Sequence, residues 1–337
     1  MAEREMNNMA ESPLQNLDCN FSSWLQNRKS EVGKHKAGKY EWDYSYPMDL
    51  ELRKTLENMH GFMAFAKYAT STIARQEIDK GHRSWLAVGP NQFPEVYDLG
   101  RDCAKRLGIG IPNIFIANDD EFNAYTYASD DIDPIIVIHN LLLERYSLPE
   151  LKCIIAHECG HIHNYHTPFT LMSRLLAEHA VNGGRMAGLA QLPVALLSLG
   201  ADLTLNMWSR AAEVTADRAA LICCDDVEDA FQATGRLSYG AVRVEDRITS
   251  KLDIESLREQ LRMTEASGSK YMESLYNHPI TTKRVFAQME FAQSETLYSW
   301  RPDLLKPGVV PKTRARVDAE VKNIIKLNGR GKADGNR

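Results

Sequence analysis

The chain has 337 residues, of which 44% are hydrophobic and 25% charged, a composition typical of a globular protein with a sizeable core. Its 40 basic and 45 acidic residues give a net charge of −5, which argues against nucleic acid as the main partner. The polar, partly acidic start lacks the apolar core of a secretory signal, and the six cysteines form no CxxC pair. We therefore expect reduced thiols in a cytoplasmic protein.

The N-terminal part is expected to contain an arm followed by helices. Residues 1–45 are polar and unpatterned, which predicts a flexible arm. From Pro47 to Ile78 apolar residues recur every three or four positions, which predicts one long helix. A short strand at 84–88 and a helix over 93–109 that ends in glycine are expected next.

Three strands are expected in the middle of the chain, where β-branched and aromatic residues alternate with Asp and Asn. They lie in 111–119, in 122–130 and at the start of 134–143. The rest has mostly helical periodicity, so the order predicts an α+β fold that is mostly helical with a small β-sheet. We place its main domain at 46–300. The basic C-terminal tail, 301–337, contains the sequence RARVDAEVKNIIKL, which favours one short helix.

The longest apolar stretch is MAGLAQLPVALLSLGA at 186–201, and Pro193 interrupts it. It is shorter than the roughly 20 residues that a membrane-spanning helix needs. A buried or partly exposed helical hairpin is the simpler interpretation. A shallow membrane contact through this stretch is the alternative, with the protein peripheral at the inner face of a membrane.

Histidines and a glutamate gather in the sequence IIAHECGHIHNYH, after the third expected strand. Ser147 and Glu150 form a capping-box pattern that predicts the start of a helix just before it. On that helix His157 and His161 lie one turn apart, so their imidazoles can bind one metal ion. Glu158 lies beside them and can reach a water molecule on that ion, which is the H-E-x-x-H arrangement.

A third metal ligand is expected from a later helix. Glu213 is the best candidate, because it lies in an apolar helical run where a lone acid would be costly to bury. Asp217, one turn further on, can accept a hydrogen bond from a ligand imidazole and fix its tautomer. The alternative for both acids is an ion pair with Arg210 or Arg218 on a solvated face.

The remaining histidines of the cluster fit less well. The metzincin pattern fails, since Asn164 and Thr167 stand where it requires glycine and histidine. His163 and His166 are out of phase with the first two histidines on a regular helix. We expect them to pack or to bond to the backbone near the helix end, and a role for His166 in supporting a ligand stays open.

These residues resemble peptidase family M48, the HtpX and CAAX prenyl protease family of zinc peptidases. LPELKCIIAHECGHIHNYH followed by SRAAEVTADRAAL is similar to the family's H-E-x-x-H helix and its E-x-x-x-D helix. NAYTY resembles the family's edge strand, HPITTKRV resembles a later family motif, and His166 matches a histidine common after the zinc motif. The resemblance covers about residues 90–290, with Asn140 in place of a glycine and Ile280 in place of a proline.

The resemblance implies a gluzincin-type metallopeptidase fold, with an edge strand packed on the H-E-x-x-H helix. It implies that one Zn²⁺ per chain is held by His157, His161 and Glu213, with Glu158 as the general base. It further implies that His278 stabilises the oxyanion and that Arg284 pairs with an acid. Besides the ligands, the supporting residues would be Asp217, Arg284 and His166.

We therefore expect a zinc-dependent metalloendopeptidase that binds a peptide or protein as an extended strand against Asn123, Ala124 and Tyr125. Many family members carry membrane-spanning helices, whereas this chain looks like a soluble member. One alternative is a catalytically silent, zinc-stabilised peptide-binding module. The intact Glu158 speaks against it, because a structural zinc site needs no base. A hydrolase of some non-peptide amide is a weaker alternative, since an edge strand favours extended peptides.

Overall fold

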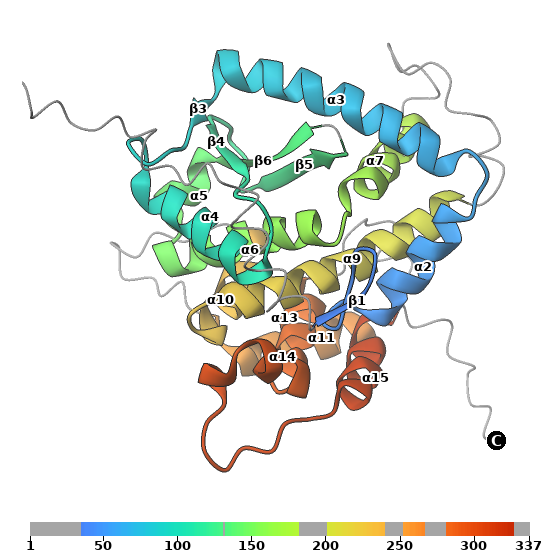
Figure 1. Cartoon of the computed structure of the whole chain (residues 1–337). Coiled ribbons are helices and arrows are strands. Elements are labelled where there is room, and N and C mark those ends of the chain that lie inside the picture. The colour runs from blue at the N-terminus through green and yellow to red at the C-terminus, as the bar shows by residue number, and fades with distance from the viewer. Residues whose placement is uncertain (1–34, 131, 182–200, 240–251, 267–280, 327–337) are drawn as a thin grey trace, which may run out of the picture.

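The computed structural model describes residues 35–130, 132–181, 201–239, 252–266 and 281–326 (Figure 1). Within them a small sheet lies between helix α3 (Phe62–Ser84), which crosses one face, and α6 (Leu148–His163) on the other side. Further helices pack below α6. This α+β arrangement, mostly helical with a small sheet, agrees with the fold class predicted from the sequence.

The sheet has four strands in the order β3-β4-β6-β5, so β5 is an edge strand. Strands β4 and β6 run parallel, and the other two pairs are antiparallel. The bounds are β3 (Leu86–Ala87), β4 (Asn113–Ala117), β5 (Ala124–Ser129) and β6 (Ile132–His139).

Both faces of the sheet are covered, which explains the apolar run Ile135–Ile138 within β6. Ile136 and Ile138 belong to the core cluster that includes α6, whereas Ile135 and Val137 belong to the cluster that includes α3. Successive side chains of a strand point to opposite faces, so a strand buried on both sides has no polar alternation.

The long helix expected from Pro47 is two helices, and that prediction is wrong. Helix α2 (Pro47–Glu57) ends before a turn, and α3 begins after Gly61. Gly61 has φ of 76°, a left-handed backbone that glycine adopts without strain. Helix α4 (Pro94–Leu107) ends at Gly108 in the same conformation, as its sequence predicts.

Helix α6 is fixed at its start and in its middle. Ser147 and Glu150 form the expected capping box, in which the Ser147 N–H donates to Glu150 Oε2 at 2.9 Å. Further along, α6 crosses α9 (Ala201–Cys223) at Gly160. A Cβ atom on Gly160 would lie 2.7 Å from Cβ of Ala219. The two helices therefore approach so closely that only glycine fits at position 160.

The other helices pack around α6 and α9, some directly and some through α13 or the sheet. They are α5 (Asn140–Arg145), α7 (Thr167–Val181), α10 (Val227–Tyr239), α11 (Ile254–Ala266), α13 (Thr281–Phe291), α14 (Glu295–Trp300) and α15 (Arg314–Ile325). A short 3-10 helix, η4 (Pro302–Leu304), follows α14.

The packed structure extends beyond the domain boundaries expected at residues 45 and 300. A hairpin of β1 (Lys36–Gly38) and β2 (Glu41–Trp42) precedes Tyr44, whose side chain is fully buried. At the other end, the predicted short helix forms as α15 and buries Val317, Val321 and Ile325 against the core. Both described ends therefore belong to the domain.

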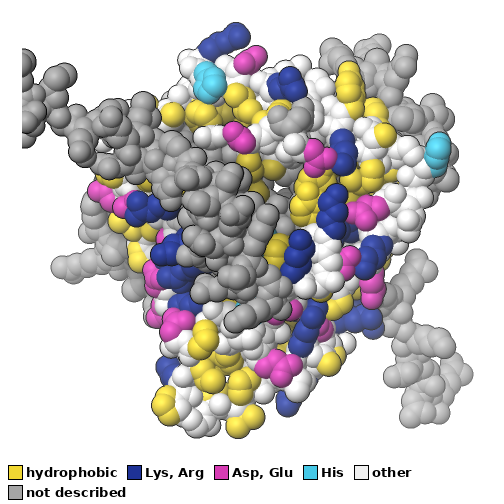
Figure 2. Space-filling model, viewed as in Figure 1, with side chains coloured by type: hydrophobic (Ala, Val, Ile, Leu, Met, Phe, Trp, Pro, Cys, Tyr) yellow, Lys and Arg dark blue, Asp and Glu magenta, His cyan; other side chains and the backbone are white. Residues whose placement is uncertain are grey.

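No helix among the described residues is long and apolar enough to cross a membrane. Residues 186–200 of the apolar stretch lie outside the described part of the chain. On the face shown in Figure 2, acidic and basic side chains are interspersed, in keeping with the small net charge.

Candidate metal centre

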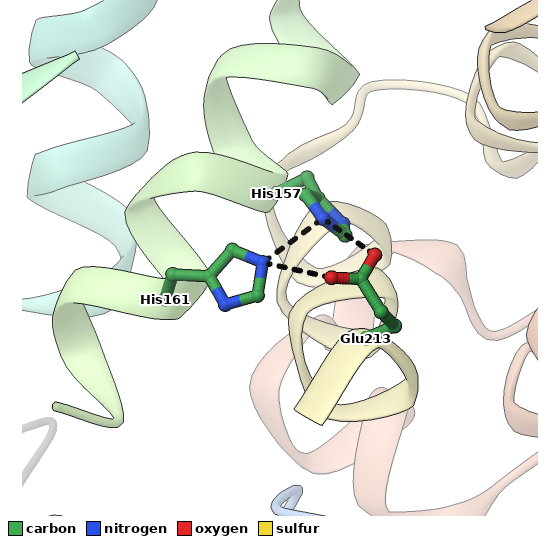
Figure 3. A group of neighbouring side chains, drawn as sticks. All are labelled: His157, His161 and Glu213. Atoms are coloured by element: carbon green, nitrogen blue, oxygen red, sulfur yellow. Dashed lines mark hydrogen bonds and ion pairs between the residues drawn. The ribbon is translucent and has the colours of Figure 1, made fainter. Parts of the chain in front are cut away.

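Three side chains expected to bind a metal converge at the place where α6 and α9 cross (Figure 3). Nε2 of His157 lies 3.1 Å from Nε2 of His161. The Glu213 carboxylate, from α9, lies 3.4 Å from His157 Nε2 and 3.6 Å from His161 Nε2. His161 and Glu213 are buried and His157 is nearly so, and one ligand atom from each of the three lies within 4.8 Å of the others.

These separations fit a zinc ion. Zinc bound by nitrogen and oxygen lies about 2.0–2.2 Å from each ligand, so two corners of its tetrahedron are about 3.4 Å apart. The nitrogen–nitrogen distance of 3.1 Å and the nitrogen–oxygen distances of 3.4 and 3.6 Å scatter around that value. Two neutral imidazoles and one carboxylate are also the donor set of open, catalytic zinc sites.

Asp217 and Arg284 support two of these three side chains. Asp217 Oδ1 lies 3.0 Å from Nδ1 of His157, which leaves Nε2 facing the other ligands. Arg284, from α13, donates to both oxygens of Asp217 at 2.6 and 2.8 Å and lies 3.1 Å from Glu213. The two acids therefore pair with Arg284. Arg218, one of the alternative partners, pairs with Asp318 at 2.7 Å instead.

The two histidines of the motif differ in their electrostatics when no metal is bound. Burial lowers the pKa of His157, but hydrogen bonds to Asp217 and to Glu213 outweigh it and raise the pKa to about 10. Burial and the neighbouring His157 hold the pKa of His161 well below its usual value. His161 is therefore neutral and able to bind a metal ion, whereas a metal ion would have to displace a proton from His157.

His166 lies closer to the centre than its spacing predicts. Its Nδ1 is 2.9 Å from Nδ1 of His161, and its Nε2 is 3.0 Å from Asp49 Oδ2 in α2. The half-turn mismatch assumed a continuous helix, but α6 ends at His163 and Tyr165 has a left-handed φ of 58°. The chain turns back there and brings His166 under His161. Packing near the helix end is thus only part of its environment.

A cavity of about 660 Å³ opens onto the three ligands. It is lined by Glu158 and the two histidines of α6, and by Asn123, Ala124 and Tyr125 of the edge strand and the turn before it. The carbonyl of Asn123 accepts from the His139 N–H at 3.0 Å. Because antiparallel hydrogen bonds alternate, the backbone N–H and C=O of Ala124 point away from β6, along the open edge.

Some residues near the cavity escaped prediction, and one predicted residue lies outside the described part of the chain. Arg174 lines the cavity and donates to the hydroxyl of Tyr127 at 3.1 Å. Asp49 lies behind His166. Neither belongs to a sequence motif, so spacing gave no signal for them. His278, expected near the oxyanion, falls within 267–280, outside the described residues.

Comparison with known proteins agrees with this geometry. The model of "Peptidase family M48" matches residues 90–290, which is more than half of the chain. The chain belongs to peptidase family M48. The matched range coincides with that of the resemblance noted in the sequence, which is thereby confirmed.

Relatives of this M48 chain carry protease names. It is 25% identical over 261 residues to "Plastoglobule-localized metallopeptidase 48, chloroplastic" of Arabidopsis thaliana, covering 75% of this chain and 73% of the relative. It is 22% identical over 224 residues to "Protease HtpX homolog" of Bifidobacterium longum, covering 61% and 72%. No solved structure matches the chain. Family membership supports metallopeptidase activity, and the buried His-His-Glu group of the M48 chain can hold the metal.

Proposed function

We propose that the protein is a zinc-dependent metalloendopeptidase with Glu158 as its general base. The convergence of His157, His161 and Glu213 at zinc-like separations, on the wall of a cavity that Glu158 also lines, carries this proposal. The gluzincin type of site follows from the same set, since the third ligand is a glutamate from a later helix.

Each residue has a defined task. His157, His161 and Glu213 hold the zinc ion, which when bound lowers the pKa of a water molecule and polarises the scissile carbonyl. Glu158 accepts the proton of the attacking water and donates it to the leaving amine. Asp217 and Arg284 keep His157 and Glu213 oriented. His278 as oxyanion donor stays a prediction from the family resemblance.

The substrate binds as an extended strand beside β5. The backbone of Ala124 supports this, because it lines the cavity and faces away from β6, so that a peptide added there can exchange main-chain hydrogen bonds with the sheet. A peptide lying along β5 would pass between that strand and α6, where Glu158 lies. The cytoplasmic location expected from the sequence is part of the proposal.

A peptide digest tests the function. The purified chain is analysed for bound zinc and incubated with unfolded casein or a peptide library, with and without a chelator. We expect about one zinc per chain, internal cleavages, and loss of cleavage when zinc is removed.

Two variants make this test specific. Glu158→Gln should retain zinc and lose cleavage, because the amide cannot accept the proton, whereas Glu213→Ala should lose the zinc itself. Undiminished cleavage by Glu158→Gln would contradict the mechanism. Zinc and peptide binding without any cleavage by the unaltered chain would favour the silent binding module instead.

A further inference from the structure

We infer that Asp49 is a positioning residue of the metal centre, which acts through His166 to fix the tautomer and the orientation of His161. The inference rests on the proposed function in one respect, namely that His161 binds a metal ion. Asp49 lies in α2, before the residues 90–290 that match the family. The inference thus assigns a role in the metal centre to a segment outside the matched region.

His161, His166 and Asp49 form a continuous, buried series of hydrogen bonds. His161 Nδ1 lies 2.9 Å from His166 Nδ1, and His166 Nε2 lies 3.0 Å from Asp49 Oδ2. The side chains of His166 and Asp49 are fully buried. Water cannot substitute for either contact, so each group depends on the protein partner that the structure gives it.

Metal binding by His161 requires one order of donors and acceptors along the series His161, His166 and Asp49. His161 faces the other ligands with Nε2, so its Nδ1 must carry the proton and donate it to His166 Nδ1. His166 Nδ1 must then be unprotonated, which puts the ring proton on Nε2. That N–H donates to Asp49. The Asp49 carboxylate at the end of this series therefore selects the one tautomer of His166 that can accept a hydrogen bond from His161.

Asp49 is held as an anionic acceptor by its other contacts. Trp208 Nε1 donates to Oδ1 at 2.8 Å, and the Thr215 hydroxyl donates to Oδ2 at 2.7 Å. Burial raises the pKa of Asp49, but the neighbouring His166 and Arg53 and the hydrogen bonds outweigh it and lower the pKa below its usual value. Both carboxylate oxygens thus receive donors, and none of these contacts requires Asp49 to donate.

Asp49→Asn keeps the shape of the side chain, but an amide cannot accept hydrogen bonds on both of its sides. If its oxygen faces His166 and Thr215, its NH₂ group opposes the Trp208 N–H. If the amide is turned over, its NH₂ donates to His166 Nε2 and shifts the ring proton to Nδ1, which then opposes the Nδ1–H of His161. Either arrangement disturbs the support of the ligand.

The test measures zinc affinity by competition with a chromophoric chelator. Asp49→Asn should weaken zinc binding about 10- to 100-fold, the range typical for groups that orient a metal ligand. Thr215→Val is the control, since it removes one donor to Asp49 and leaves the tautomer of His166 unchanged. It should lower thermal stability but change the zinc affinity less than about threefold.

Two variants of His166 separate support of the ligand from packing. His166→Phe keeps an aromatic ring against Trp208, whose ring centroid lies 5.4 Å from that of His166, but it offers no acceptor. His166→Gln loses the ring and retains an oxygen that can accept from His161. If His166 acts through its hydrogen bond, the Gln variant binds zinc more tightly than the Phe variant. The reverse order would mean that packing is the role, and it would overturn the inference.

Nuclear magnetic resonance of ¹⁵N-histidine-labelled, zinc-loaded protein provides an independent readout. His166 should show an unprotonated Nδ1 and a protonated Nε2, and the opposite tautomer would overturn the inference. If the unaltered chain binds zinc and cleaves peptides but Asp49→Asn binds zinc equally well, only this inference fails. If the unaltered chain binds no zinc, the proposed function fails, and the role of Asp49 falls with it.

Discussion

At the scale of single residues, Arg284 and the protonated His157 together balance the charges of Glu213 and Asp217 when no metal is bound. Burial lowers the pKa of the Arg284 guanidinium, but its pairs with the buried carboxylates of Asp217 and Glu213 outweigh burial and raise that pKa above its usual value. A buried carboxylate without a cation is costly, so the metal-free and the zinc-loaded protein should depend on Arg284 to different degrees.

We predict that Arg284→Leu lowers the stability of the metal-free protein by about 3 kcal/mol, because two buried acids lose one of their two cations and keep only the protonated His157. Zinc supplies positive charge at Glu213, so adding it should recover part of the loss. Urea unfolding in chelator and in excess zinc measures both values. An equal loss in the two conditions would contradict this account.

The case of His166 shows what residue spacing can and cannot predict. The ligand pair and Glu158 were predictable because one helical turn fixes their relation. The contact between His166 and His161 was not, because it depends on the end of α6 and on the left-handed Tyr165. Asp49 reaches the centre from another helix, and its pairing leaves no local pattern in the sequence.

At the scale of elements, the crossing of α6 and α9 sets the geometry of the metal centre. His157 and His161 come from one helix and Glu213 from the other, so their separation depends on how closely the helices approach at Gly160. A Cβ atom there would meet Ala219 Cβ at 2.7 Å and Ala216 Cα at 3.0 Å.

We predict that Gly160→Ala destabilises the protein by about 1–3 kcal/mol through overpacking, although alanine favours an isolated helix by about 1 kcal/mol. Zinc affinity should fall as well, since the ligands move apart. Adding Ala219→Gly removes the nearest atom and should recover part of both losses. If Gly160→Ala alone were as stable as the unaltered chain, the helices would be able to separate without a loss of stability.

The edge strand gives a second prediction at this scale. Ala124→Pro removes an N–H that faces away from β6, which an edge strand tolerates. We expect kcat/KM for peptides to fall about fivefold to tenfold, the effect of one lost hydrogen bond, with unchanged zinc content. Substrates N-methylated at successive positions serve as the matched control. Unaltered kcat/KM would argue against strand addition at β5.

Element boundaries were predictable where the signal is local. The capping box of Ser147 and Glu150 and the glycine after α4 both involve residues within one turn. The break between α2 and α3 was missed because the apolar periodicity continues across the turn at 58–61, in which Gly61 has a left-handed backbone.

At the scale of the whole molecule, residues near both described ends join in one buried contact. Arg218 of α9 is buried and donates to the Tyr44 carbonyl at 3.1 Å and to Asp318 of α15 at 2.7 Å. Composition alone assigned both ends to tails, because it does not report which apolar residues find a partner. Tyr44 and Val317 do find one in the core.

We predict that Asp318→Ala lowers the free energy of unfolding by about 3 kcal/mol, since it leaves the Arg218 guanidinium buried without its acid. Asp130→Ala, which removes an exposed partner of Lys67, should cost at most about 1 kcal/mol. Urea unfolding of both variants with zinc held constant provides the comparison. Equal effects would mean that α15 contributes little to the fold.

If substrates join the open edge of β5 as proposed, this edge has a consequence for which proteins are cut. A strand can join this edge only if several consecutive residues have their own backbone groups free, and compact native proteins seldom offer such a stretch. Selection would then depend on conformational state more than on side-chain identity. Loops, termini and unfolded chains would enter, while the same sequence inside a folded domain would be spared.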